Sequence, residues 1–284
     1  MLNGIDVYVG DGKIDWAKVK ADGIDFAMIK ASQGYPVQGS TLSPFTDRNF
    51  VKNIEEASAA GIKCGVYHYL MAKTTEAARA EAKYFIETVA PYRELVSFPA
   101  CVDMENDIAK RYLSKEKALN TQILVTFLET VSTAGFKPMV YLNPNFIRYL
   151  LDFEQLSRYD VWLAYYTTEK QFLKFVKELK NPSQIKIWQY GQRTVDGISD
   201  PTDGNFGFFD YEPQVGDVNR DGTVDPLDAS LILSYDAGYT SLDDEQKRLG
   251  DVNFDGETDP IDASLILRAD AGITELSAEH HRND

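Results

Sequence analysis

The chain has 284 residues, of which 44% are apolar, and a formal net charge of −15. This length accommodates one large barrel and a small second module, so we expect two domains. The acidic balance argues against nucleic acid as a partner, and no run approaches the roughly eighteen apolar residues needed to cross a membrane.

Short apolar runs alternate with amphipathic stretches over the first two hundred residues. The runs that predict strands are residues 5–9, 26–31, 64–70, 100–105, 139–142, 161–166 and 185–190. Residues 49–60, 75–89 and 115–134 have a helical period, and Gly23, Gly61 and Gly135 follow helical stretches as C-caps do. This order predicts an α/β fold over residues 1–210. We expect an irregular TIM-like barrel of about eight parallel strands with fewer than eight helices.

Acidic residues stand at two predicted strand ends, where parallel barrels carry their chemistry. Val102 and Met104 alternate with Asp103 and Glu105, so the two acids should face the barrel axis, as should Asp6 in the first strand. The charge of Asp103 and partial burial should raise the pKa of Glu105, which then donates a proton to a glycosidic oxygen. The alternative is a hydrogen-bonded structural pair capping a strand.

Aromatic residues at strand ends are candidates for stacking on sugar rings, although such residues also build cores. Tyr141 and Trp188 are the preferred candidates, followed by Tyr67 and Trp162. His68 is interpreted as a hydrogen-bonded structural residue rather than a catalyst.

A chain of motifs over residues 3–210 resembles the glycoside hydrolase family 25 muramidases. The motifs are Gly4-Ile-Asp-Val, Gly12-Lys-Ile-Asp-Trp16, Gly23-Ile-Asp-Phe-Ala27, Gly65-Val-Tyr-His-Tyr69, Val102-Asp-Met-Glu105, Trp162-Leu-Ala-Tyr165, Trp188-Gln-Tyr190 and Val195-Asp-Gly-Ile198. The chain departs from the family at Tyr8, where members commonly have Ser, and at Asp11, where they commonly have Gln.

The resemblance implies four active-site acids. Glu105 matches the general acid and Asp103 the residue that orients the 2-acetamido group of the substrate. Asp6 matches a supporting acid, and Asp203 matches another, with Asp210 as the alternative for this last position.

Near the C-terminus one loop sequence occurs twice, and each copy continues into Ala-Ser-Leu-Ile-Leu. Oxygen donors at fixed offsets, with Gly at position 6, match the ligands that calcium requires, so we expect two structural calcium ions and none for catalysis. The alternative is a pair of acidic surface turns. The expected ligands are Asp217, Asn219, Asp221, Thr223, Asp225 and Asp228, then Asp251, Asn253, Asp255, Glu257, Asp259 and Asp262.

No amphipathic helix enters the first loop, and Asp rather than Glu closes both. Loop then helix, doubled, resembles the type I dockerin over residues 214–275, a small all-α module that binds a cohesin of a scaffoldin. We expect a linker at 211–215, the dockerin at 216–275 and a polar tail at 276–284. The copies share 17 of 24 positions, so a cohesin could bind either face. The contacts implied by the family are Pro226, Leu227, Ser230, Pro260, Ile261 and Ser264.

Together these features predict an extracellular or cell-surface cellulosomal enzyme, monomeric when free, whose secretion signal is not in this sequence. It should cleave the β-1,4 bond between N-acetylmuramic acid and N-acetylglucosamine in peptidoglycan. The alternatives are hydrolysis of another N-acetylated glycan such as chitin, and an inactive sugar-binding barrel displayed on a scaffold.

Overall fold

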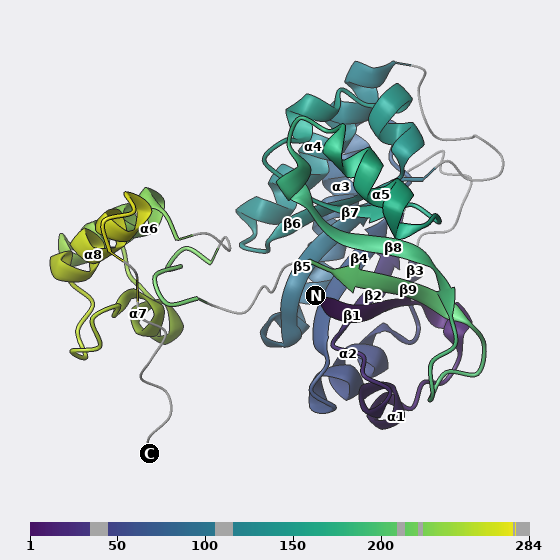
Figure 1. The fold of residues 1–284 in the computed structure, drawn as a ribbon, viewed down its shortest axis with the longest axis horizontal. Coiled ribbons are helices and arrows are strands. Elements are labelled where there is room, and N and C mark those ends of the chain that lie inside the picture. Colours follow the sequence, from purple (N-terminus) through teal and green to yellow (C-terminus); the bar gives the residue numbers. More distant parts are fainter. Residues whose placement is uncertain (35–44, 106–115, 209–213, 221–223, 275, 277–284) are drawn as a thin grey trace. The chain divides into compact units, whose positions relative to one another are not determined.

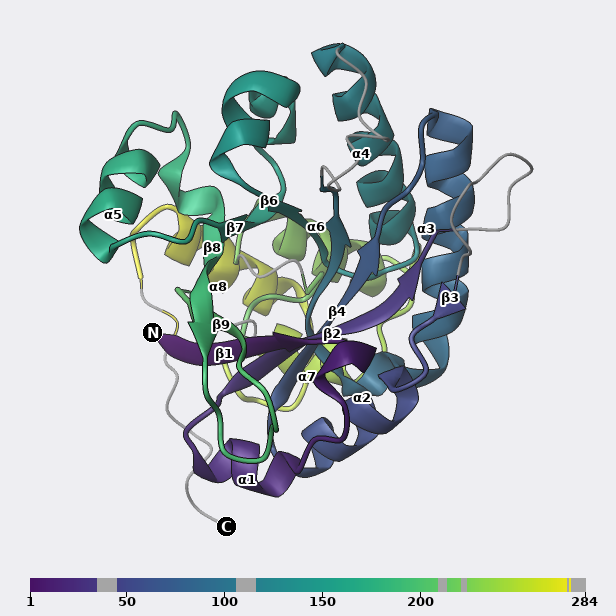
Figure 2. The ribbon, with the colours of Figure 1, turned by 90° about the vertical axis from the view of Figure 1, so that its right-hand side faces the viewer.

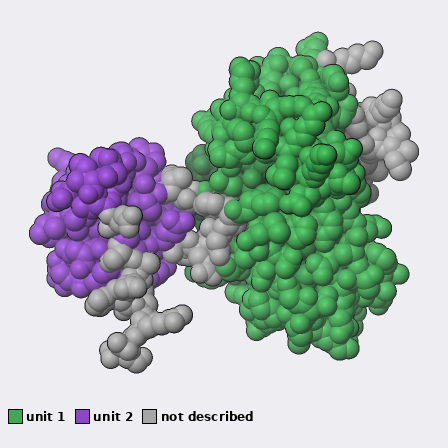
Figure 3. Space-filling model, viewed as in Figure 1, with its two compact units in different colours: residues 1–210 green, residues 211–284 purple. Residues whose placement is uncertain are grey.

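The computed structural model describes residues 1–284 apart from 35–44, 106–115, 209–213, 221–223, 275 and 277–284. The chain forms two compact units, residues 1–210 and residues 211–284 (Figure 3). No helix among the described residues is long and apolar enough to cross a membrane.

The first unit is a closed barrel of eight strands, to which a two-residue strand is added beside β2 (Figure 1). The barrel order is β1, β9, β8, β7, β6, β5, β4 and β2, and pairing of β1 with β2 closes the ring. The strands are β1 (Leu2–Val7), β2 (Phe26–Gln33), β3 (Phe45–Thr46), β4 (Lys63–Tyr69), β5 (Val96–Asp103), β6 (Pro138–Leu142), β7 (Asp160–Ala164), β8 (Ile185–Arg193) and β9 (Thr202–Gly207).

The last barrel strand, β9, differs from the expected all-parallel arrangement. It runs antiparallel to both of its neighbours, β8 and β1. The segment that joins β8 to β9, residues 194–201, is short and contains no helix. A parallel crossover needs a dozen or more residues, usually including a helix, so this connection can only return the chain as a hairpin.

Helices cover the outside of the strands (Figure 2). The predicted helices are confirmed as α2 (Phe50–Ala59), α3 (Thr75–Val89) and α4 (Lys117–Thr133), and the described residues of this unit also form α1 (Trp16–Ala21) and α5 (Glu169–Lys177). The glycines expected as C-caps, Gly23, Gly61 and Gly135, all have the positive φ that ends a helix. Between β6 and β7 lie only the short turns η3 (Phe146–Leu150) and η4 (Phe153–Leu156), which makes the barrel irregular.

The strands present two different faces. Ile5, Val7, Val102 and Met104 are buried in the cluster that also holds the inner faces of the helices, as the alternation predicted. The barrel interior is filled at one level by Phe26, whose ring stacks on Phe98 with centroids 5.0 Å apart and covers Gly4. The interior positions that follow along the strands are polar, and they form the site described below.

The described part of the second unit contains three helices, α6 (Pro226–Asp236), α7 (Asp244–Gly250) and α8 (Pro260–Asp270). Equivalent residues of the two copies share its core, including Val218 with Val252 and Ile232 with Ile266. Val215 and Leu276, which the sequence assigned to the linker and the tail, pack against this core, so the folded unit extends one residue further at each side.

Candidate active site and metal loops

Four acidic residues lie at one end of the barrel interior. Asp6 is on β1, directly paired with Asp203 on β9, and Asp103 ends β5 with Glu105 two residues further on. The charge of Asp103 interacts with those of Asp6 and Glu105, and Glu105 interacts with Asp203. The structure therefore brings all four together, while Asp210 lies outside the described residues.

A continuous chain of hydrogen bonds runs through the buried part of this cluster. Oδ2 of Asp6 accepts from Nε2 of Gln189 at 2.9 Å and from Nδ2 of Asn205 at 2.8 Å. Oδ1 of Asn205 accepts from the Trp162 indole at 2.7 Å. The Tyr141 hydroxyl donates to Oε1 of Gln189 at 2.9 Å and is also hydrogen-bonded to Glu105. Both amides are thus fixed in orientation, and they present donors to Asp6.

Burial raises the pKa of every acid in the cluster. The pKa of Asp6 rises from 3.8 to about 8, chiefly because the carboxylate is removed from water and next because Asp203 is nearby. Burial, and then the charge of Glu105, raises the pKa of Asp103 well above its usual range. The pKa of Glu105 is raised by burial and by Asp203. Neighbouring negative charges disfavour ionisation of all four acids at once, so the cluster retains protons near neutral pH.

Two carboxylate oxygens in this cluster have no hydrogen-bond partner within the described chain. They are Oδ1 of Asp103 and Oδ1 of Asp203, and both are shielded from solvent. Asp103 as a whole is only 8% exposed. An unpaired buried acceptor costs about 1–3 kcal/mol, so each of these oxygens makes ionisation of its carboxyl group less favourable.

The predicted sugar-stacking aromatics prove to be part of the protein framework. Trp162 is 1% exposed and is held between Tyr67 and Tyr141 in edge-to-face contacts. Trp188 points out of the barrel, where its ring stacks on Phe172 with centroids 4.2 Å apart. Its prediction as a sugar platform is therefore wrong, because its face is already covered. The same applies to Trp162.

His68 takes the structural role expected of it. It is fully buried against the helices, with Nδ1 2.9 Å from the Ser32 hydroxyl and Nε2 3.0 Å from Glu81. Burial lowers the pKa of His68 and so favours the neutral form of the ring over the charged one. It lies on the helix side of β4, away from the acids.

In the second unit, the acid that closes each loop is fully buried. Asp228 accepts backbone N–H groups from Asn219 and Asp225, and Asp262 accepts them from Val252, Asn253 and Asp259. These bonds fold each loop back onto the start of its helix.

The structure describes every residue of the second loop, 251–262, so its oxygen donors can be compared with those that calcium requires. Asp251 accepts the backbone N–H groups of Asp255 and Gly256, and Asn253 accepts that of Asp255, so the side chains at positions 1 and 3 turn into one loop. Gly256, at position 6, has the positive φ expected there. An oxygen-only set on a tight turn fits a hard cation. Within the described residues, however, no three acidic, His or Cys side chains are close enough to enclose an ion. Asp221 and Thr223 of the first loop lie outside the described residues.

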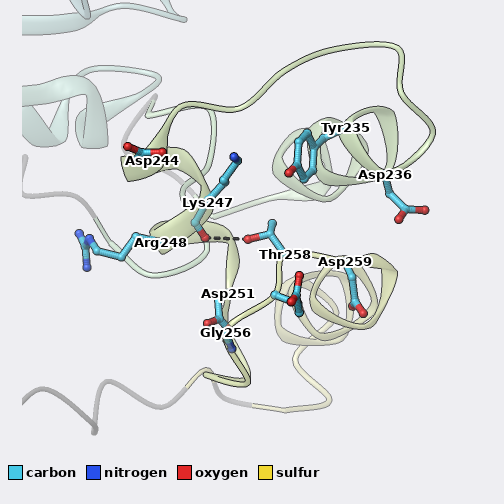
Figure 4. Close-up of a pocket in the computed structure, with 10 residues that line it drawn as sticks. Tyr235, Asp236, Asp244, Lys247, Arg248, Asp251, Gly256, Thr258 and Asp259 are labelled. Atoms are coloured by element: carbon cyan, nitrogen blue, oxygen red, sulfur yellow. Dashed lines mark hydrogen bonds between the residues drawn. The ribbon is translucent and has the colours of Figure 1, made fainter.

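A hollow separates the second loop from α7, and Thr258 spans it by donating to the Lys247 carbonyl at 2.8 Å (Figure 4). The six residues expected to contact a cohesin are all exposed, at equivalent places at the start of α6 and α8. They are Pro226, Leu227, Ser230, Pro260, Ile261 and Ser264.

Comparison with known proteins agrees with this geometry. The family model of the glycosyl hydrolases family 25 matches residues 5–197, and that of the dockerin type I domain matches residues 215–269. The chain belongs to glycosyl hydrolase family 25. Its second unit is a dockerin, a class of domain that generally binds calcium.

Several proteins of known structure or name resemble the family 25 unit. The autolytic lysozyme of Clostridium acetobutylicum is 27% identical over 202 residues, which are 71% of this chain and 54% of that protein. The modular autolysin LytC from Streptococcus pneumoniae, solved with a synthetic peptidoglycan ligand, has a TM-score of 0.60 at 25% identity, covering 72% of this chain and 46% of that one. A family 25 glycosyl hydrolase from Bacillus anthracis has a TM-score of 0.59 at 22% identity, with 78% and 94% covered. The chain spans about half the length of the autolytic lysozyme.

Four residues of the family 25 unit's site were missed by the sequence reasoning. Gln189 and Asn205 hold Asp6, and the exposed Tyr166 is hydrogen-bonded to Asp203. Lys30 lies 9% exposed on the inner side of β2, and its charge acts on both Asp103 and Glu105. A lysine inside the otherwise apolar run of β2 was a readable signal, because such a charge needs acids nearby. Asn205 carried no such signal, since its strand was not recognised.

Proposed function

We propose that this protein cleaves the β-1,4 bond between N-acetylmuramic acid and N-acetylglucosamine in peptidoglycan, and that its dockerin attaches it to a cohesin. The observation that carries the proposal is the convergence of Asp103 and Glu105 with Asp6 and Asp203 at one end of the barrel. Acid catalysis of glycoside cleavage requires a pair of carboxyl groups, one of which keeps its proton, and Glu105 is a partly exposed acid with a raised pKa beside Asp103.

The proton for the leaving group comes from Glu105. In the free enzyme Asp103 and Glu105 compete for it, since both pKa values are raised. When the acetamido N–H of the substrate donates to the Asp103 carboxylate, the ionised form of Asp103 is favoured. The proton then remains on Glu105, which is the group that faces the glycosidic oxygen. Substrate binding thus sets the protonation state that the reaction needs.

Bond cleavage follows from this arrangement. Glu105 transfers its proton to the leaving oxygen as the anomeric C–O bond breaks, and the acetamido oxygen, oriented by Asp103, attacks the anomeric carbon. Water then opens the resulting ring and returns a proton to Glu105, so the outcome is retention. Direct attack by water would instead give inversion, and NMR of the first-formed anomer distinguishes the two.

The dockerin supplies attachment rather than chemistry. The apolar Leu227 and Ile261 are 63% and 57% exposed at equivalent positions, which offers a cohesin two similar faces. We propose two calcium ions, one in each loop, and an extracellular or cell-surface location on a scaffoldin. Calorimetric titration of the chelated protein should give a stoichiometry of two, and an Asp262→Asn variant should bind one ion fewer.

The experiment that tests the hydrolase assignment is mass analysis of fragments released from purified cell walls, with chitin oligomers assayed in parallel. Fragments ending in N-acetylmuramic acid are expected from the wild type. Glu105→Gln should reduce release by about 10²–10⁴-fold, while Glu87→Gln, on the exposed side of α3, should not. Turnover of chitin alone would favour the alternative substrate, and undiminished release by Glu105→Gln would refute the acid assignment.

A further inference from the structure

Two aromatic rings beside the acid cluster remain unusually exposed. Tyr8 is 48% exposed and Phe45 is 36% exposed. Both lie over the buried ammonium of Lys30, with Nζ 5.9 Å from the Tyr8 centroid and 5.5 Å from that of Phe45, and Tyr69 lies at 5.0 Å. The ammonium also donates to Gln33 at 3.0 Å. The ammonium therefore lies close to both rings, and each ring keeps an exposed part.

The chain around Tyr8 is held in place by two carboxylates. The Tyr8 N–H donates to Asp11 at 2.8 Å, and the next N–H, of Val9, donates to Asp47 at 2.8 Å. Asp47 is 2% exposed and lies two residues after Phe45, so one buried carboxylate fixes both segments. The Tyr8 ring lies across Gly10, where any added Cβ would fall 2.2 Å from it. The exposed ring is thus pre-positioned.

These rings adjoin the reacting groups. Tyr8 follows Asp6 by two residues, and the ammonium beneath the rings acts on Asp103 and Glu105. Rigid, exposed aromatic faces beside a site bind the apolar face of a ring at low entropic cost. We propose that Tyr8 and Phe45 form a shelf on which one N-acetylated pyranose of the glycan stacks, next to the sugar that is cleaved.

The inference rests on the proposed function, since it takes the ligand to be a peptidoglycan glycan. The shelf would make binding stronger for glycans long enough to reach it, and it would leave the chemistry at Glu105 unaltered.

The test measures glycan binding without turnover, in a Glu105→Gln background. The probe is a purified tetrasaccharide of alternating N-acetylglucosamine and N-acetylmuramic acid, titrated by calorimetry. Tyr8→Ser should weaken binding by about three- to tenfold, and Tyr8→Phe should restore it. Tyr239→Ser removes a tyrosine that is 88% exposed in the other unit, and it serves as the matched control. In the active protein, Tyr8→Ser should raise KM for this substrate more than it lowers kcat.

The outcomes distinguish the shelf from the hydrolase function. Equal affinities of the parent protein and its Tyr8→Ser variant, when tryptophan fluorescence shows that both are folded, would overturn the shelf. Weaker binding by Tyr8→Ser in a protein whose wild type cleaves no cell wall would support the shelf and refute the hydrolase function. Absence of binding by every variant would overturn both.

Discussion

Replacing Asp6 by asparagine should stabilise the barrel, and the gain should depend on pH. The pKa of Asp6 is about 8 in the folded protein against an ordinary 3.8. At a pH between 3.8 and about 8, Asp6 has lost its proton in the unfolded chain but keeps it in the folded chain. The stability contributed by the protonated group is therefore lost as pH rises, until it is gone above the folded pKa. The amide introduced by Asp6→Asn does not titrate, and its oxygen can still accept from Gln189 and Asn205.

The magnitude follows from the size of the shift. The loss amounts to about 1.4 kcal/mol per pH unit, or about 3 kcal/mol between pH 5 and pH 7. Because the Asp6 side chain keeps some contact with solvent, we expect Asp6→Asn to gain about 1–3 kcal/mol over that interval relative to the wild type.

Denaturant unfolding monitored by tryptophan fluorescence measures this gain. All three tryptophans, Trp16, Trp162 and Trp188, belong to the first unit, so the signal reports the barrel alone. Asp200→Asn, an exposed change in the segment before β9, is the control and should show no pH-dependent gain. A difference between Asp6→Asn and wild type that is constant from pH 5 to pH 8 would refute the reasoning, as would destabilisation at pH 7.

Three further outcomes are expected. Lys30→Met removes the ammonium that lowers the pKa values of Asp103 and Glu105. The alkaline limb of the pH profile of kcat/KM, where Glu105 loses its proton, should therefore move to higher pH. An unmoved limb would contradict this. Asn205→Leu leaves the Trp162 indole N–H unpaired, and denaturation of the barrel should show a loss of about 1–3 kcal/mol, whereas an unchanged midpoint would count against the hydrogen-bond chain. Chelation should lower helical circular dichroism and abolish cohesin binding while leaving tryptophan fluorescence unchanged; a chelator-resistant complex would speak against calcium.

The parts of the fold that follow a simple period were predictable. The helix α3 was expected at its observed bounds, Thr75–Val89, because its apolar residues recur at helical spacing, and in the structure the Thr74 side chain caps it by accepting from the Ala77 N–H. The inward alternation of Asp103 and Glu105 was likewise readable, because side chains of a strand alternate between two faces.

The strand β9 was not predictable in the same way. Thr202-Asp-Gly-Asn-Phe-Gly207 has two glycines, an Asp and an Asn, all of which are depleted in strands. It is a strand because it closes the barrel between β8 and β1, which is a tertiary requirement. The orientation of Trp188 was missed for a related reason. Its choice between the barrel interior and the helix layer depends on the register of β8, which a single strand sequence does not specify.

The pairing of β1 with β9 joins the two extremes of the barrel unit, residues 2–6 with residues 203–207. A nascent chain emerging from the ribosome cannot complete this seam until residue 207 has been made, because the early strand must wait for the last one. The donors that hold Asp6, from Gln189 and Asn205, also arrive only then. A truncated translation product therefore carries the glutamate that would deliver the proton but lacks the assembled acid cluster, so the proposed hydrolase activity requires synthesis of the whole barrel.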